Sequence, residues 1–426
     1  MVSHCNRRRE WTFCGVYMNF RVLLAVLALF SATHPAFAGD DKATARLKDL
    51  QARVSKREFQ EDKLRRELIN FCREQVGTPI YAKGIGTLAA CPSPLDRLDA
   101  NAIDEEDRKL LSIRELVGYI RPHNRAIASL TFSFDGTLLA TSSWDNTVHM
   151  QKLGDKEPKS WARLEASPSG IAFSPDGGWL ATGGRDTRVV VWSLAGAKPT
   201  REHQLSGHKN RPFCVAFSPD GKLLASGCHT PVLRVWKWDV LTPGVWEILA
   251  DEDSSARGIA SLAFRHDGKL LAAANHLGKE SLNLWTTNGE RVTEREIPAM
   301  IARRAACSPT EPILAFAGDE AAIHLWNISD DRFEKRRTLP GHIGKAFPPF
   351  VKALAFSPDG KILASSGQDK SVRLWDVANG TKLREWTFRF EAHALAFSSD
   401  GRHLAVGNSD GTLFLLRLES AKIKAD

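Results

Sequence analysis

Two pairs of His and Asp are the first candidates for chemistry in this chain of 426 residues. His123 is followed by Asp145, and His342 by Asp369. A histidine that an aspartate orients can act as a general base for a serine nucleophile, so such a pair would indicate hydrolysis. Each pair, however, lies inside one unit of a sequence repeat and has a structural duty there. We therefore expect no catalytic residue and no enzymatic activity.

The seven cysteines are the second group of candidates. A disulfide between Cys72 and Cys91 would pin a loose segment to the helix expected before it, and two free thiols remain the alternative. Cys214 and Cys228 fall on adjacent strands but out of register, and we expect them and Cys307 to be small core residues. No Cys and His spacing matches a zinc site and no acidic loop matches a calcium site, so we expect neither a metal nor a cofactor.

The charge of the chain gives no sign of a nucleic-acid partner. Its formal net charge is +8, from 58 Lys and Arg against 50 Asp and Glu. The first 38 residues hold four Arg and one Glu, so the remainder carries 54 basic and 49 acidic residues, a balance of +5. No basic block interleaved with aromatic residues runs along the chain, as a nucleic-acid surface would require. We expect a mixed charged surface and no nucleic-acid partner.

The N-terminus predicts export. An uncharged apolar run, residues 22–32, follows Arg21 and is followed by Ala36-Phe37-Ala38. This is the layout of a signal peptide, here residues 1–38, with cleavage expected after Ala38. The run is too short to cross a bilayer, so no membrane span is expected after cleavage. Met18 is an alternative start. We expect a periplasmic or secreted protein, in which disulfides are chemically possible.

A four-residue turn recurs seven times. Pro sets φ for its second position, Asp bonds its own backbone and Gly takes the left-handed exit, so each copy should join two strands tightly. The copies are residues 133–136, 174–177, 218–221, 265–268, 308–311, 357–360 and 398–401. Four residues before the end of each copy stands Phe, or Cys in the fifth, and three residues after it stands Leu followed by Ala. One packing environment is thus built seven times, in a stacked or circular array.

Each unit closes with alternating apolar residues, which predict a strand buried on one face. The strand leads to Trp in five units and to Gln151 and Leu416 in the other two. Residues 113–420 resemble the WD-repeat family, and the signal peptide suggests an exported, bacterial-type member. The resemblance implies an all-β, seven-bladed WD-repeat β-propeller at residues 113–426. A charged helical segment and linker, residues 39–112, would precede it.

The same resemblance implies a hydrogen-bonded tetrad of His, Ser or Thr, Asp and Trp that stiffens a blade. Only the sixth unit keeps all four residues: His342, Ser365 or Ser366, Asp369 and Trp375. The first unit has Gln151 in place of Trp, the second lacks the His, and the third has Thr230 in place of Asp. These departures argue against uniform rigidity but leave the fold prediction intact.

Two segments outside the repeats have expected positions. Residues 115–120 precede the first unit where an outer strand would lie, so they should complete blade seven and hide its open edge. Residues 41–74 lack Pro and Gly and carry one apolar stripe, which predicts one long amphipathic helix. Arg57 and Glu61 interrupt the stripe, so a helix lying on the propeller is favoured over a homodimer through a coiled coil. Residues 77–102 should form an irregular linker, with Gly84-Ile85-Gly86 as a turn.

Binding residues are expected on the upper face, because the resemblance implies that the residue before each tight-turn Asp points there. These positions differ in chemistry from blade to blade, as recognition requires. They hold Trp144, Arg185, His229, Asp319, Gln368 and Ser409, of which Trp144 and Arg185 are the leading anchors. An inserted loop at residues 343–350 is a further candidate. Ordinary solvated loop residues remain the alternative for all of them.

The sequence therefore predicts a non-enzymatic scaffold that binds a protein or peptide on one propeller face. The alternative is a ligand-binding or hydrolytic propeller, similar to a lactonase, that holds a metal in its central channel. Such a site needs acidic or His residues that converge on the axis. No repeated set of this kind is present in the sequence.

Overall fold

The described residues of this computed structural model cover three helices and the propeller. They are residues 41–55, 63–75, 79–88, 116–153, 159–165, 168–184, 186–230, 232–238, 244–249, 257–277, 282–290, 292, 302–319, 321–330, 333–342 and 350–418. The predicted signal peptide, Cys91, Arg185 and the domain boundary expected after residue 112 lie outside them.

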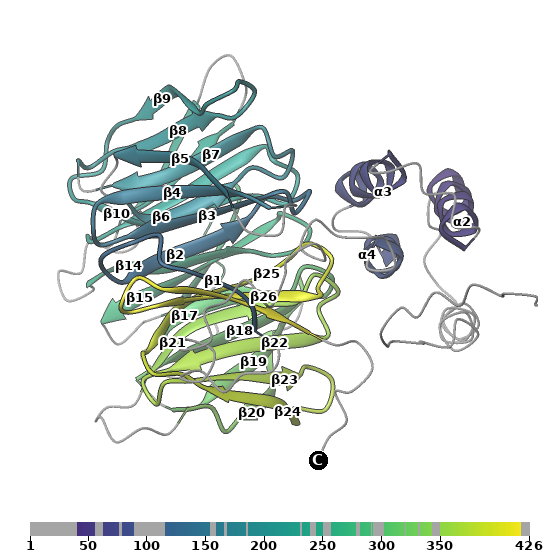
Figure 1. Cartoon of the computed structure of the whole chain (residues 1–426). Helices are drawn as coiled ribbons and strands as arrows, with labels where there is room; N and C mark the ends of the chain where they lie inside the picture. The colour runs from purple at the N-terminus through teal and green to yellow at the C-terminus, as the bar shows by residue number, and fades with distance from the viewer. Residues whose placement is uncertain are drawn as a thin grey trace, which may run out of the picture. The chain divides into compact units, whose positions relative to one another are not determined.

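Seven antiparallel sheets follow one another along the chain (Figure 1). Blade one is β2 (Ile127–Phe132), β3 (Leu138–Ser143), β4 (Thr147–Lys152) and β5 (Lys159–Glu165). Blade two is β6 (Pro168–Phe173), β7 (Trp179–Gly184), β8 (Val189–Ser193) and β9 (Thr200–Leu205). Blade three is β10 (Pro212–Phe217), β11 (Leu223–Cys228), β12 (Val232–Lys237) and β13 (Gly244–Leu249).

The second half of the ring repeats this order. Blade four has, within the described residues, β14 (Arg257–Phe264), β15 (Leu270–Leu277) and β16 (Leu282–Thr286). Blade five is β17 (Ala302–Cys307), β18 (Ile313–Gly318), β19 (Ile323–Ile328) and β20 (Phe333–Leu339). Blade six is β21 (Val351–Phe356), β22 (Ile362–Gly367), β23 (Ser371–Asp376) and β24 (Lys382–Thr387). Blade seven is β25 (Ala392–Phe397), β26 (His403–Asn408), β27 (Leu413–Arg417) and β1 (Leu116–Ile120).

The ring is closed, and the seven-bladed propeller is confirmed. The first strands of consecutive blades contact one another in turn, from β2 to β25, and β25 contacts β2. At the outer edge β1 pairs with β27, from Leu116 opposite Leu416 to Ile120 opposite Leu413. Figure 1 shows this early strand among the late ones. The predicted outer strand therefore covers the edge of blade seven, where an open edge would invite pairing with other chains.

The repeated Leu-Ala pairs form the core between blades. In every unit this Leu is at most 1% exposed, and so is the Ala that follows it. The large side chain fills the space between two sheets, and the small one lets the sheets approach. The sequence offsets are thus packing positions, which is why they persist where the turn residues vary.

The N-terminal segment forms a bundle of three helices and not one long helix. Two helices, α2 (Asp41–Ser55) and α3 (Lys63–Glu74), replace the predicted one. Arg46 pairs with Glu74, and Arg53 Nη1 lies 2.5 Å from Glu67 Oε2. In one straight helix Arg46 and Glu74 would be about 42 Å apart, so α3 runs back along α2. The apolar stripe, which the alternative homodimer would have used, is buried within this bundle.

The segment predicted as an irregular linker also contains a helix, α4 (Pro79–Leu88), which begins at Pro as helices often do. Gly84 lies inside this helix and therefore forms no turn. A Cβ at this position would stand 2.8 Å from Cys72 Sγ. Gly84 therefore serves the close approach of α4 to α3. Cys72 is buried in this contact, and its disulfide with Cys91 stays a prediction. No helix of the described residues is long and apolar enough to cross a membrane.

Candidate functional site at the mouth of the central channel

The innermost strand of every blade carries a β-bulge at the same place. In β2, Ile127 pairs with Ser143 and Ser129 with Ser142, so Ala128 has no partner residue in the ladder. The other six first strands skip one residue at the matching position. The seven bulge residues are Ala128, Ser169, Phe213, Ala260, Arg303, Lys352 and His393. Because a bulge redirects a side chain and bends the strand, each blade supplies one such residue to a common ring.

A cavity of about 580 Å³ lies at this ring. Six of the bulge residues line it, together with the residues that follow them in blades one to five. Trp144 and His229 complete its mouth from the loops. The cavity is therefore the upper end of the central channel. Its lining contains three Arg and two His but no Asp or Glu.

The structure brings two of the predicted binding residues to this mouth. Trp144 is 53% exposed, and its ring lies edge-on to His393 with centroids 5.6 Å apart. His229 is exposed and packs in the same manner on Phe213, at 5.2 Å. Both loop residues thus contact bulge residues, which places them on one surface with the channel.

The remaining predicted binding residues do not line the cavity. Asp319 is half-buried and pairs with Arg303, with 3.1 Å between its Oδ2 and Nη2 of the arginine. Gln368 is half-buried, and its backbone N–H donates to the carbonyl oxygen of Phe350. Ser409 is likewise half-buried. Arg185 and most of the inserted loop of blade six lie outside the described residues, so these predictions remain open.

Basic side chains of blades five and six share an aromatic ring at the mouth. Arg303 lies over the Phe350 ring at 5.1 Å from its centroid, and Lys352 Nζ lies over it at 4.5 Å. Lys352 Nζ also stands 3.3 Å from the Glu391 carboxylate. Cation–π contacts of this kind fix long side chains in place. The charges of Arg303 and Lys352 are thus already matched by Asp319 and Glu391.

Burial sets the protonation state of two titratable groups of the cavity lining, Cys214 and His393. Burial raises the pKa of the Cys214 thiol to about 12, so the thiol is protonated near neutral pH. Burial also lowers the pKa of His393, helped by the charge of Lys352, although Glu391 opposes this. No three His, Cys, Asp or Glu side chains gather around a possible metal position in the described part of the chain.

Sequence reasoning missed the bulge residues because it searched the loops. They include Arg303, Lys352 and His393, which lie within strands. A polar residue in the alternating pattern of a strand is ordinarily assigned to the solvent-facing side. The signal was nevertheless available: each bulge residue stands four residues before the repeated Phe, or Cys307 in blade five. A fixed offset with varied chemistry is what a ring of recognition residues requires.

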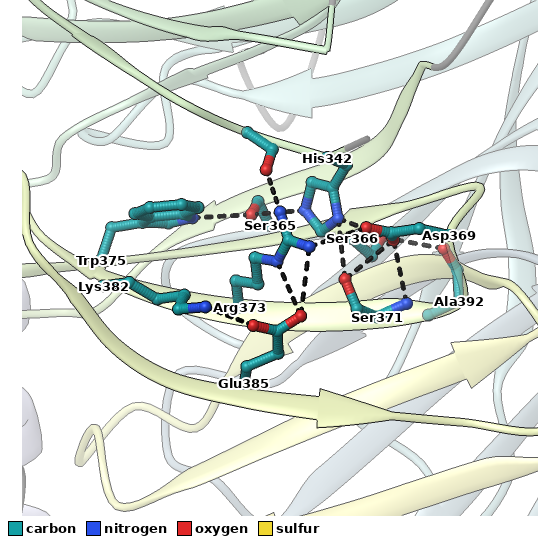
Figure 2. Close-up of polar contacts among 11 residues, drawn as sticks. His342, Ser365, Ser366, Asp369, Ser371, Arg373, Trp375, Lys382, Glu385 and Ala392 are labelled. Carbon is teal, nitrogen blue, oxygen red and sulfur yellow. Dashed lines mark hydrogen bonds and ion pairs between the residues drawn. The ribbon is translucent and has the colours of Figure 1, made fainter. Parts of the chain in front are cut away.

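The tetrad of blade six is a separate, buried network (Figure 2). His342 Nδ1 lies 2.9 Å from Asp369 Oδ1, and its Nε2 lies 2.8 Å from Ser365 Oγ. Trp375 Nε1 donates to the same Ser365 oxygen at 2.8 Å. Ser366 instead donates to the carbonyl oxygen of Ala392, so Ser365 is the serine that joins His and Trp. The network joins the residue at the entry to blade six, His342, to the two middle strands β22 and β23, and none of its members lines the cavity.

Blade three keeps part of the same arrangement. Ser226 Oγ lies 2.7 Å from His208 Nε2 and accepts a hydrogen bond from Trp236 Nε1 at 3.0 Å. A family model described as "WD domain, G-beta repeat" matches residues 114–150, 163–193, 199–237, 333–376 and 385–415. The chain is a seven-bladed β-propeller of WD repeats.

The matched WD repeats leave out the described strands of blade four and the first three strands of blade five, β17 to β19. Blade five has Cys307 in place of the repeated Phe, and Thr310-Glu311 in place of Asp-Gly. Blade four needs two more residues to reach Trp285. Both sheets nevertheless stand in the ring, because the buried Leu-Ala pairs are kept. The packing positions thus preserve the fold where the WD-repeat signature is weak.

Three proteins similar to this chain share low identity with it. A "Protein LST8 homolog" of Drosophila melanogaster is 28% identical over 40% of this chain and 53% of its own length. The "Nuclear distribution protein nudF" of Emericella nidulans is 35% identical over 23% of this chain and 22% of its own. The "Target of rapamycin complex subunit LST8" of Bos taurus is 23% identical over 50% and 66%. The chain thus spans between a fifth and two thirds of these relatives.

Proposed function

We propose that this WD-repeat propeller is a non-enzymatic scaffold that binds a protein or peptide at the mouth of its central channel. The observation that carries the proposal is Trp144, whose side chain is 53% exposed at the rim of a cavity of about 580 Å³. Exposed Trp side chains beside pockets are frequent binding hot spots. The bovine relative is named as a subunit of a complex, which supports a role in assembly.

The hydrolytic alternative has less support from this geometry. A lactonase-like propeller needs carboxylates or histidines that converge on the axis to hold a metal. The described lining has no carboxylate, and its two histidines, His229 and His393, each pack against an aromatic ring. An apolar and basic mouth of this size instead matches the recognition of a few side chains.

Replacing Trp144 with Ala tests the scaffold function. The full chain, tagged at its C-terminus, captures its partner from an extract of the cells that make it, and the affinity of the purified partner is then measured. We expect the Trp144→Ala variant to lose about 2 kcal/mol of binding free energy, roughly 30-fold in Kd. The matched control is Arg201→Ala, at an exposed site on β9, which should leave Kd unchanged. Equal affinity of the two variants, with both folded, would move the binding site away from the channel.

We further propose that the protein is exported after cleavage behind Ala38. The support is the apolar run at residues 22–32 and the small residues at positions 36 and 38. We expect N-terminal sequencing of the C-terminally tagged protein to begin at Gly39. Leu27→Arg should block cleavage because it puts a charge in the apolar run, and Leu27→Val should not. A mature protein that begins at Met1 or Met18 in all three chains would contradict export.

A further inference from the structure

A second ring of residues lies one position after the bulges. Six of its seven members are small and leave the channel open, whereas blade five supplies an arginine. The ring consists of Ser129, Gly170, Cys214, Ser261, Arg304, Ala353 and Ala394. Arg304 is therefore the single long and charged side chain of this layer, and it lines the cavity.

Among the described residues, the hydrogen bonds of the Arg304 guanidinium go to backbone oxygens alone. Its Nε donates to the carbonyl oxygen of Lys352 at 2.5 Å, and its Nη1 donates to that of Arg303 at 2.9 Å. Burial lowers the pKa of Arg304, and the charge of Arg303 adds to this effect, while Cys214 opposes it. The Arg304 side chain is thus fixed in one orientation, and the cost of burying its charge is not offset by a carboxylate of the described residues. Both properties are expected of a group that binds an anion.

The neighbouring cations differ from Arg304 in this respect. Arg303 is paired with Asp319, and Lys352 with Glu391, whereas Arg304 forms no ion pair with any carboxylate of the described residues. Arg211 lies over the Phe213 ring at the rim and, like Arg304, forms no ion pair with a carboxylate of the described residues. The cavity therefore has unmatched positive charge at two depths, one inside the channel and one at its edge.

Neutral donors stand beside this charge. Ser129 and Ser169 line the cavity, and their hydroxyl groups form no hydrogen bond with another described residue. Hydroxyl groups with free donors and a fixed guanidinium are the groups that bind a carboxylate in a partly buried site. Because one guanidinium stands at this depth, the charge matches a carboxylate, with one negative charge, better than a phosphate, with nearly two.

We propose that the channel receives a carboxylate from an extended acidic segment of the partner protein, and that this carboxylate pairs with Arg304. The proposal rests on the scaffold function and names the chemistry of its partner. Trp144, Phe213 and His393 at the mouth contact the residues that flank the inserted one. Arg211 attracts a further carboxylate of the same segment.

Fluorescence polarisation with two labelled peptides tests this charge selection. The probe is Gly-Ser-Glu-Asp-Glu-Asp-Ser-Gly with an amidated C-terminus, and the comparison peptide carries Gln and Asn in place of Glu and Asp. We expect saturable binding of the acidic peptide to the full chain, weakened by salt as surface ion pairs are. The neutral peptide should bind at least tenfold more weakly, because it leaves Arg304 unpaired.

Variants assign the effect to the channel. Arg304→Gln should raise the Kd of the acidic peptide by about tenfold or more, whereas Arg201→Gln, which removes the same charge from β9, should change it less than about twofold. Arg304→Lys keeps the charge but loses the planar guanidinium, so its Kd should lie between those of Arg201→Gln and Arg304→Gln. If Arg304→Gln unfolds, Arg211→Gln at the rim provides a second test, with a smaller increase expected.

Several results overturn the proposal. They are equal binding of the two peptides, no saturable binding of the acidic peptide at millimolar concentration, and equal losses in Arg304→Gln and Arg201→Gln. Competition separates the sources of negative charge, since displacement by inorganic phosphate at lower concentration than by glutarate would indicate a phosphate site. A captured partner that loses affinity for Trp144→Ala but binds Arg304→Gln as tightly as wild type would support the scaffold function. That result would refute only the proposal that an acidic segment enters the channel.

Discussion

Replacing Gly341 with Ala is expected to lower the free energy of unfolding by about 4 kcal/mol or more, because the added methyl group meets the closest backbone atom of any described glycine. Gly341 has φ +61°, and a Cβ there would stand 1.6 Å from the carbonyl oxygen of Ala321. This oxygen is fixed, because it accepts a hydrogen bond from the N–H of His342 at 2.8 Å. The backbone must therefore move, and with it the tetrad histidine that follows.

Gly177→Ala is the matched control for this change. Gly177 has φ +72°, but a Cβ there would meet nothing within 4 Å. The substitution adds only the strain of a left-handed Ala, about 1 to 2 kcal/mol. Urea unfolding followed by tryptophan fluorescence gives both free energies. Losses of equal size would show that the contact with Ala321 relaxes without cost and that positive φ alone matters.

The propeller could be predicted from the sequence because its information is local and repeated seven times. The turn at 174–177 and the Leu180-Ala181 pair after it fix one hairpin and one packing layer, and the copies repeat both. The outer strand at 116–120 followed from the same spacing, since it stands where each unit has its outer strand. Periodicity and a closed ring leave few other arrangements.

The helical bundle could not be predicted in the same way. The apolar stripe that includes Leu50 and Leu64 keeps one phase on both sides of its interruption at Arg57 and Glu61, yet it serves two helices that pack against each other. A heptad pattern states which face is buried but not where the chain turns back. Gly84 was misleading for a related reason, because a glycine needed for a close contact between helices has the same sequence signal as one needed for a turn.

The channel was missed because a bulge depends on the pairing of two strands. Alternation along a strand sends the side chains of residues 303 and 304 to opposite faces, so the local pattern gives no sign that both line one cavity. The bulge places both at the channel, and the sequence shows this only when all seven first strands are aligned on the repeated Phe. The loop residues Trp144 and His229 were found because a turn leaves a stronger local signal.

Asp369 of the blade-six tetrad combines several contacts in a nearly buried position. Its Oδ1 lies 2.8 Å from Ser371 Oγ as well as 2.9 Å from His342 Nδ1, and its Oδ2 lies 2.9 Å from Arg373 Nη2. Burial alone would raise the pKa of Asp369, but the hydrogen bonds from His342 and Ser371 outweigh it and lower the pKa to about 2. The ionised carboxylate is thus more stable in the folded chain than in the unfolded one, where its pKa is about 3.9.

We expect Asp369→Asn to lower the free energy of unfolding at pH 7 by about 3 kcal/mol, since each pKa unit corresponds to about 1.4 kcal/mol. A carboxylate whose pKa is lower in the folded chain stabilises the fold at pH values above its unfolded pKa. This stabilisation is lost as the pH falls through the folded pKa, so the difference in unfolding free energy between wild type and variant should shrink from pH 4 to pH 2. Urea unfolding across this range measures it. Asp186→Asn is the control, because Asp186 holds the matching turn of blade two, is exposed and has no tetrad histidine beside it. A difference that stays constant down to pH 2 would mean that Asp369 stabilises the blade by shape and not by charge.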